Sequence, residues 1–142
     1  MTSIKPPIMI CDIAIARRAF LAPMSGVSDL PFRRLAARYG AGLVFSEMVA
    51  GEEVVRGSEE ARLRAEGEGL ACHVVQLAGR EAGAMRRGVA IAEAAGAAII
   101  DINMGCPAKR VVNGYAGCAL MRDLDHALRL IAATVAAASV PV

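Results

Sequence analysis

Four short apolar runs alternate with segments of helical character along this sequence, and no other feature limits the fold as strongly. The runs are residues 19–22, 43–45, 72–77 and 97–102, and each has the length and apolarity of a buried strand. Strands that alternate with helices pair in parallel, and each helix crosses back over the sheet. We therefore predict an α/β fold built on a parallel sheet.

The segments between the runs carry signals for helix ends. Ser28 can cap a helix that Gly40 ends, and Gly96 ends a helix over residues 79–95. Residues 51–69 are polar and rich in Gly and Glu, and we interpret them as a long excursion that contains a short helix. Three apolar side chains at helical spacing are expected on the inner face of the helix over 79–95: Met85, Val89 and Ala92.

The last third of the chain is predicted to end in one more helix and the start of a strand. Asp123 can cap a strongly apolar helix over residues 124–138, and residues 140–142 read as a fifth strand at its start. The apolar side chains at helical spacing in this helix are Leu128, Ile131 and Val135. Too little chain follows to cover such a face.

Two architectures fit this alternation: an open doubly wound sheet and a (β/α)8 TIM barrel. A doubly wound nucleotide fold carries a G-x-G-x-x-G fingerprint after its first strand, whereas residues 23–26 read PMSG. The unusual residues follow strand ends, where a barrel places its chemistry, so we favour the barrel. A barrel needs about 250 residues, so residues 1–142 are expected to form only about its first four and a half βα units. The C-terminal half-barrel is then missing.

Composition excludes several other classes of protein. Apolar residues make up 56% of the chain, but none of its runs approaches the roughly 18 that cross a membrane. No signal peptide is recognisable, so we expect a cytoplasmic protein. The four cysteines form no C-x-x-C pair and are expected to be free thiols. Cys72 and His73 point to opposite faces of a strand, so we expect no metal site.

The net charge of +2 says little about partners, but the positions of the cations are informative. Arg33, Arg34 and Arg38 are spaced as a solvated face of the first helix would be. Lys109 and Arg110 differ from them because they directly follow an unusual loop, residues 103–107. We therefore separate these two cations from the ordinary surface charge.

Two strand ends carry residues suited to a flat polar ligand. Residues 23–26 follow the first run, where Gly permits close approach of the backbone and Met24 offers an adaptable apolar surface. Gln76 ends the third run, and its amide must find partners because burying it unpaired costs about 1–3 kcal/mol. An amide that both donates and accepts suits the carbonyl and imide edge of a flavin, although a loop carbonyl would satisfy it equally.

Cys106 follows the fourth run in the sequence NMGCP, residues 103–107, where Gly permits a tight turn and Pro stiffens it. A thiol with an ordinary pKa of about 8.5 is mostly protonated at neutral pH, so Cys106 can act as a general acid. It could instead be a nucleophile, but no obvious His partner exists. His73 lies within a strand and His126 within a helix, and we interpret both as structural.

Taken in this order, these segments resemble the tRNA-dihydrouridine synthases, including the bacterial branch once named as nitrogen-regulation proteins. The resemblance runs through residues 20–33, 46–48, 76–79 and 101–109. Other flavin barrels share the APM opening, whereas the NMGCP loop is specific to this family. The resemblance implies an FMN-dependent enzyme that uses NADPH to reduce particular uridines in tRNA to 5,6-dihydrouridine.

The resemblance also implies roles for individual residues. Pro23, Met24 and Ser25 would hold FMN, and Gln76 would bond its ring. Reduced flavin would give hydride to C6 of the uracil, and the protein would supply the geometry. The uridine would have to swing out of the folded RNA to reach the barrel mouth.

On the substrate side, Cys106 would protonate C5 of the uracil from the face opposite the flavin. Asn103 would help to hold the ring system, and Lys109 and Arg110 would contact phosphates at the rim. Family members continue with further phosphate-binding loops and a C-terminal helical domain that grips tRNA. Because both are absent from these 142 residues, we expect the chain alone to be inactive.

The sequence leaves two alternative hypotheses open. One is a flavin barrel that oxidises or reduces a free pyrimidine, as dihydroorotate dehydrogenases do. The other is a non-catalytic half-barrel that self-associates through its open apolar edge.

Overall fold

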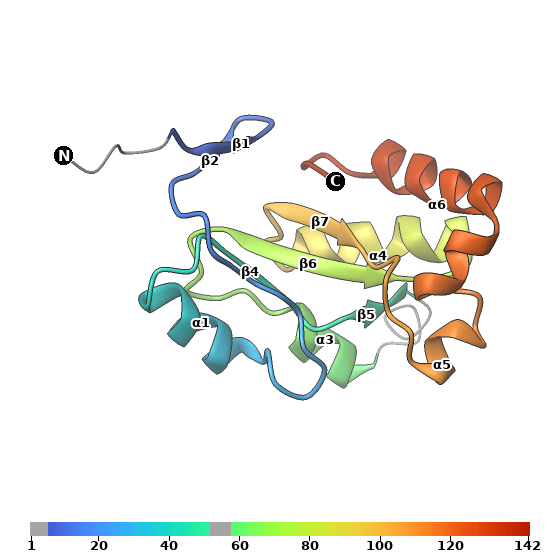
Figure 1. The fold of residues 1–142 in the computed structure, drawn as a ribbon, viewed down its shortest axis with the longest axis horizontal. Helices are drawn as coiled ribbons and strands as arrows, with labels where there is room; N and C mark the ends of the chain where they lie inside the picture. The colour runs from blue at the N-terminus through green and yellow to red at the C-terminus, as the bar shows by residue number, and fades with distance from the viewer. Residues whose placement is uncertain (1–5, 52–57) are drawn as a thin grey trace.

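The structure is a computed structural model, and it describes residues 6–51 and 58–142. Its elements follow one another as shown in Figure 1: β1 (Ile8–Ile10), β2 (Ile13–Ile15), β3 (Phe20–Leu21), α1 (Leu30–Arg38), β4 (Leu43–Phe45), β5 (Val49–Ala50), α3 (Glu59–Ala65), β6 (His73–Ala78), α4 (Ala82–Ala94), β7 (Ile99–Ile102), α5 (Lys109–Val112), the 3-10 helix η1 (Gly117–Arg122) and α6 (Leu124–Ala137). Part of the excursion predicted over residues 51–69 lies outside the described residues, and α3 is the short helix predicted within it.

A parallel sheet forms the centre of the molecule and confirms the predicted α/β fold. β3 pairs with β4, β4 and β5 pair with β6, and β6 pairs with β7, all in parallel. Leu77 of β6 is matched with both Val49 and Ile102, so β5 and β7 lie on opposite sides of β6. The strands therefore follow one another across the sheet in chain order. This order is the one a (β/α)8 barrel requires, while a doubly wound sheet reverses direction. The closed barrel itself stays a prediction.

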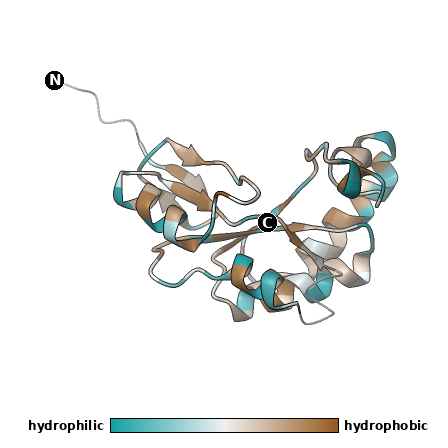
Figure 2. Cartoon of the chain, turned by 90° about the horizontal axis from the view of Figure 1, so that it is seen from below, coloured by the Kyte–Doolittle hydropathy of each residue, from teal (hydrophilic) through white to brown (hydrophobic). Residues whose placement is uncertain are grey.

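Helices α3, α4 and α6 cover one face of this sheet. Strand side chains such as Val75 and Ile100 form one buried cluster with residues of these helices. The cluster includes the three positions predicted to face inward from α4: Met85, Val89 and Ala92. In Figure 2 the strands are mostly coloured as hydrophobic, and hydrophilic colour gathers on the helices around them. Burial of each large aliphatic side chain contributes about 1.5–3 kcal/mol.

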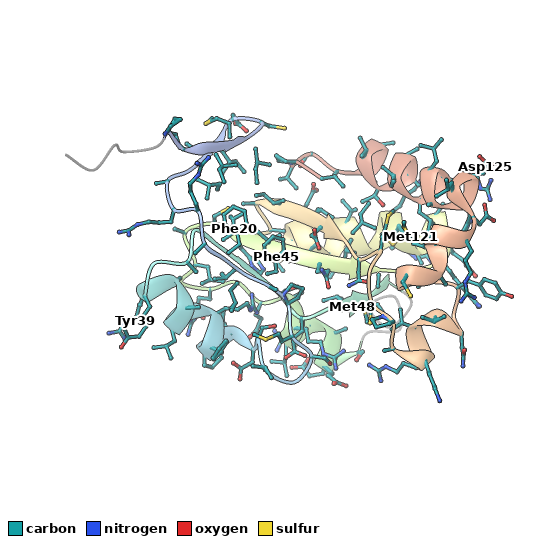
Figure 3. The ribbon with its side chains drawn as sticks, in the orientation of Figure 1. Phe20, Tyr39, Phe45, Met48, Met121 and Asp125 are labelled. Atoms are coloured by element: carbon teal, nitrogen blue, oxygen red, sulfur yellow. The ribbon has the colours of Figure 1, made fainter. Side chains whose placement is uncertain are left out.

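The other face of the sheet has a second, smaller apolar cluster. Val74, Ile99 and Leu43 pack there with Ile15 from the β1–β2 hairpin. Two aromatic side chains from neighbouring strands, Phe20 and Phe45, lie close together beside them (Figure 3). Among the described residues, this cluster contains strand side chains and their neighbours rather than helix side chains.

Most helix ends agree with the predictions, but α4 begins at Ala82 rather than at Gly79, and the start of α1 also differs. Gly40 and Gly96 adopt positive φ angles of 96° and 84° after their helices, and the Asp123 side chain accepts from the His126 N–H at the start of α6. The cap of α1 is Asp29, which accepts from the Phe32 N–H at 2.9 Å, so the prediction for Ser28 was wrong. Ser28 precedes the cap, and its hydroxyl closes the preceding turn instead.

Helix α6 packs against α4 through a stripe of small residues. The side chains it buries are Ala127, Leu130, Ala133 and Thr134. The predicted apolar stripe faces outward, since Leu128 is 63% and Val135 is 53% exposed. After α6, the carbonyl of Pro141 accepts from the Ile100 N–H at 2.9 Å. Residues 140–142 thus begin to pair along β7, as the sequence indicated.

Arg33 corrects the prediction of a solvated cationic face on α1. Its side chain is completely buried and donates from Nε to the Ser28 carbonyl and from Nη2 to the carbonyls of Arg64 and Glu66. Arg34 is also occupied, because its Nε donates to the carbonyl of Glu68 at 2.7 Å. The prediction holds for Arg38, which is exposed, and for Arg34, whose side chain is 42% exposed although hydrogen-bonded. Sequence spacing alone could not show that an excursion after β5 returns to cover this side of α1.

Along the part of the chain that the structure describes, none of the helices is both long and apolar enough to cross a membrane. Cys11, Cys72, Cys106 and Cys118 are all free thiols. Burial raises the pKa of the Cys72 thiol.

Candidate active site

The site begins where β6 and β7 end side by side. Their register places Gln76 directly opposite Asp101, so the two side chains leave the sheet on the same face. Nε2 of Gln76 donates to Oδ2 of Asp101 at 2.6 Å, a short bond of the kind that carboxylates form. Because Gln76 is only 6% exposed, this bond satisfies an amide that would otherwise be costly to bury.

Two further hydrogen bonds extend from Gln76 to the cysteine loop. Nδ2 of Asn103 donates to Oε1 of Gln76 at 2.9 Å, and the backbone N–H of Cys106 donates to Oδ1 of Asn103 at 3.0 Å. The structure therefore brings together three residues that the sequence singled out: Gln76, Asn103 and Cys106. Asp101 completes the series, and we call these four residues the amide relay.

An extra residue between β4 and β5 supports the backbone of Gln76. Phe45 is matched with Val74, and Val49 is matched with Leu77. The chain therefore advances four residues from β4 to β5 while β6 advances three, as in a β-bulge. Within the bulge, Oγ of Ser46 accepts from the Gln76 N–H at 2.9 Å and donates to the Glu47 carbonyl. This buried hydroxyl takes the place of the missing ladder bond.

The loop after β3 is held by Ser28 and Glu47. Oγ of Ser28 accepts from the Met24 N–H at 2.8 Å, and Oε2 of Glu47 accepts from the Gly26 N–H at 2.9 Å. Gly26 has a φ of 74°, which favours glycine. Glu47 is 8% exposed, and its role was missed in the sequence. A lone carboxylate within the apolar stretch from Leu43 to Ala50 was the available signal.

A second loop, also missed in the sequence, holds the cysteine loop from its other side. The carbonyl of Cys106 accepts from the Cys118 N–H at 3.1 Å. Gly117 adopts a φ of 60°, and a side chain there would place its Cβ 2.5 Å from the Cys106 carbonyl oxygen. The loop can approach this closely only because residue 117 is glycine. Cys106 is thus held at its N–H and at its carbonyl, and the residue is partly exposed.

The two cations after the cysteine loop lie on α5, and both are exposed. Arg110 lines a cavity of about 370 Å³ together with Arg64 and Arg80. Among these, Arg64 pairs with Glu60 and lies 3.8 Å from Glu47. The cavity also touches Ala78 and Gly79, at the end of β6.

The remaining predicted residues lie at the same edge of the sheet. Pro23, Met24 and Ser25 follow β3, which is two strands from β6 and hence roughly 10 Å away. Met24 is 38% exposed and Ser25 is exposed as well. Met48, labelled in Figure 3, also comes from this edge and lines the cavity that Arg64, Arg80 and Arg110 share.

His73 has structural surroundings, as predicted, while His126 is partly exposed. Nε2 of His73 lies 2.7 Å from the Ala65 carbonyl, and burial lowers the pKa of the ring, so His73 is a neutral donor. His126 lies in the first turn of α6, beside Arg129. Neither residue has a hydrogen bond to Cys106.

Comparison with known proteins gives one consistent result. Residues 20–142 match the family model described as dihydrouridine synthase (Dus). Over 130 residues the chain is 58% identical to a probable tRNA-dihydrouridine synthase of Rhizobium leguminosarum bv. phaseoli, covering 92% of this chain and 41% of the relative. It is 57% identical over 125 residues to a probable tRNA-dihydrouridine synthase of Rhodobacter capsulatus, covering 86% and 38% of the two chains.

A third relative extends the comparison beyond the first two. The chain is 45% identical over 129 residues to tRNA-dihydrouridine synthase B of Xanthomonas campestris pv. campestris, covering 90% of this chain and 39% of the relative. The chain thus spans about two fifths of the length of these relatives. The matched region contains every residue of the amide relay and both loops that flank it, and the chain belongs to the dihydrouridine synthase family.

Proposed function

We propose that the protein carrying this chain reduces uridine to 5,6-dihydrouridine in tRNA, with FMN as cofactor, NADPH as reductant and Cys106 as proton donor. The observation that carries the proposal is the amide relay, which ties the cysteine loop to the ends of β6 and β7. A thiol on a loop held from both sides can meet one ring atom of a substrate repeatedly in the same geometry. The named relatives act on tRNA, so we propose tRNA rather than a free pyrimidine as the substrate.

The residues present fit a flavin ring. After its bonds to Asp101 and Asn103, the Gln76 amide retains one N–H and one lone pair, which suit the imide and carbonyl edge of the ring. Pro23, Met24 and Ser25 would hold the ring from the neighbouring edge. FMN, when bound, supplies the hydride that is delivered to C6 of the uracil. Cys106 then gives its proton to C5 from the opposite face, and Asn103 helps to keep the uracil in place.

The cations after the cysteine loop are proposed to hold the RNA backbone. Lys109 and Arg110 are exposed on α5, only three and four positions after Cys106. Phosphate contacts fix the register of a nucleic acid without reading its sequence. Cations this close to the thiol would hold the backbone beside a flipped uridine.

Replacing Gln76 with alanine is expected to weaken FMN binding by roughly ten- to a hundred-fold, since about 1–3 kcal/mol is lost with the amide. Flavin fluorescence during dilution of the purified protein measures the change. Glu81→Ala, an exposed substitution just beyond β6, is the control. Flavin retained at wild-type affinity in Gln76→Ala would contradict the proposed contact.

The proposed function is tested on tRNA that lacks dihydrouridine. The protein is incubated with this tRNA, FMN and NADPH, and the nucleosides are then measured by mass spectrometry. Formation of dihydrouridine is the expected result. Turnover of free pyrimidines without any change in the tRNA would instead support the dihydroorotate-dehydrogenase-like alternative.

A further inference from the structure

We propose that Asp101 is a positioning residue. Its carboxylate sets the direction of the amide relay, that is, which side-chain group donates and which accepts at each hydrogen bond, and thereby holds the Cys106 loop in its reactive placement. This inference rests on the proposed function. It concerns a residue to which the sequence assigned no role, and whose side chain joins β7 to the most buried amide of the site.

The two ends of the relay determine its direction. The backbone N–H of Cys106 can only donate, and a carboxylate can only accept. Between them, the amides of Asn103 and Gln76 could each be turned to exchange donor and acceptor. Only one arrangement satisfies both ends, with every group donating toward Asp101, and it is the one observed.

Without an acceptor at position 101, this arrangement loses its anchor. Gln76 could turn over and present its NH2 group to Asn103. Asn103 would then have to turn as well, and its NH2 group would face the Cys106 N–H, a donor against a donor. Hydrogen-bonded chains polarise one another, so the effect of one carboxylate extends to the far end of the relay.

The surroundings of Asp101 support this role. Among the residues that the structure describes, no lysine or arginine forms an ion pair with Asp101. Within that part of the chain, the main partner of the Asp101 carboxylate is therefore the Gln76 amide, through the 2.6 Å bond. A carboxylate whose only task was to join two strands would not need to lie at the head of a relay that ends at the reactive thiol.

The test follows the alkylation of Cys106 by iodoacetamide in the flavin-free protein. Trypsin releases residues 88–109, in which Cys106 is the only cysteine, so mass spectrometry follows this thiol alone. We expect Asp101→Ala, which removes the acceptor, to change the alkylation rate by at least about three-fold, because the reactivity of a thiol depends on its immediate surroundings. In the tRNA assay we expect kcat to fall about ten-fold with KM for tRNA unchanged.

A compensating variant separates positioning from a structural role. In Asp101→Ala combined with Gln76→Glu, the acceptor moves to position 76, where it can accept from Asn103. Asn103 then keeps its direction, and we expect the Cys106 alkylation rate to return to within about two-fold of wild type, as coupled sites allow. Gln76→Glu alone places two carboxylates together and is not expected to do so. Asp125→Ala, at an exposed position on α6 (Figure 3), is the matched control.

Each result bears on the proposal. An unchanged alkylation rate in Asp101→Ala would overturn it, and so would a lowered melting temperature in Asp101→Ala without rescue by the double variant. Because alkylation needs neither flavin nor tRNA, these outcomes are independent of the proposed function. A wild-type protein that forms no dihydrouridine would refute that function and leave the alkylation result standing.

Discussion

Cys106→Ala is expected to lower the rate of dihydrouridine formation by about 10²- to 10⁴-fold, the contribution typical of a positioned general acid. FMN affinity should stay unchanged, because the Cys106 backbone N–H rather than its thiol joins the relay. The Asn103 bond and the Cys118 bond to the Cys106 backbone both survive this substitution. The loop therefore keeps its shape and loses only the proton. Mass spectrometry of tRNA nucleosides measures the rate, and flavin absorbance measures the binding.

A matched control for Cys106→Ala is Cys11→Ser. Cys11 is an exposed free thiol in the turn between β1 and β2, away from the carboxyl ends of the parallel strands. Its replacement should leave the rate of dihydrouridine formation within about two-fold of wild type, as most surface substitutions do. Turnover by Cys106→Ala at the wild-type rate would eliminate the thiol as proton donor.

The order of the strands could be predicted from sequence because the runs are short, apolar and regularly separated. The strand-end rule for parallel sheets then located Gln76, Asn103 and Cys106 at one edge, and their hydrogen bonds confirm that they meet. The partners of these residues could not be predicted. Asp101 lies opposite Gln76 only in the observed register of β6 and β7. A shift of one residue in this register would move the Asp101 side chain to the other face of the sheet, away from Gln76.

Other features depended on contacts between distant segments. The β1–β2 hairpin turns at Cys11, which has a φ of 51°, although turns of this kind usually contain Gly or Asn. Asp12 was therefore its only turn signal. Glu47 and Ser46 gained their roles from a bulge that only pairing with β6 creates. The amphipathic spacing of α1 could not distinguish a solvated arginine from one buried beneath a returning loop.

Arg33→Met is expected to reduce the free energy of unfolding by about 3–5 kcal/mol. Methionine fills much of the same space, but the carbonyls of Ser28, Arg64 and Glu66 lose the donors that Arg33 supplies. Hydrogen bonds from a charged group contribute about 1.5–3 kcal/mol each, and an unpaired buried carbonyl adds to the loss. Removing the charge also ends the cost of burying it, which keeps the net effect below the sum of three bonds.

Urea unfolding followed by circular dichroism measures this loss. Arg38→Met, on the exposed side of the same helix, is the control, and its free energy of unfolding is expected to stay within about 0.5 kcal/mol of wild type.

Arg33→Lys separates the effect of charge from that of geometry. An ammonium group cannot reproduce the planar fork that reaches three carbonyls from two nitrogens, so we expect it to recover less than half of the loss. A lysine variant as stable as wild type would show that charge alone, rather than the guanidinium geometry, joins α1 to the end of α3. The Met24–Gly26 turn is hydrogen-bonded to Ser28, so loosening this junction should also weaken the flavin edge of the site.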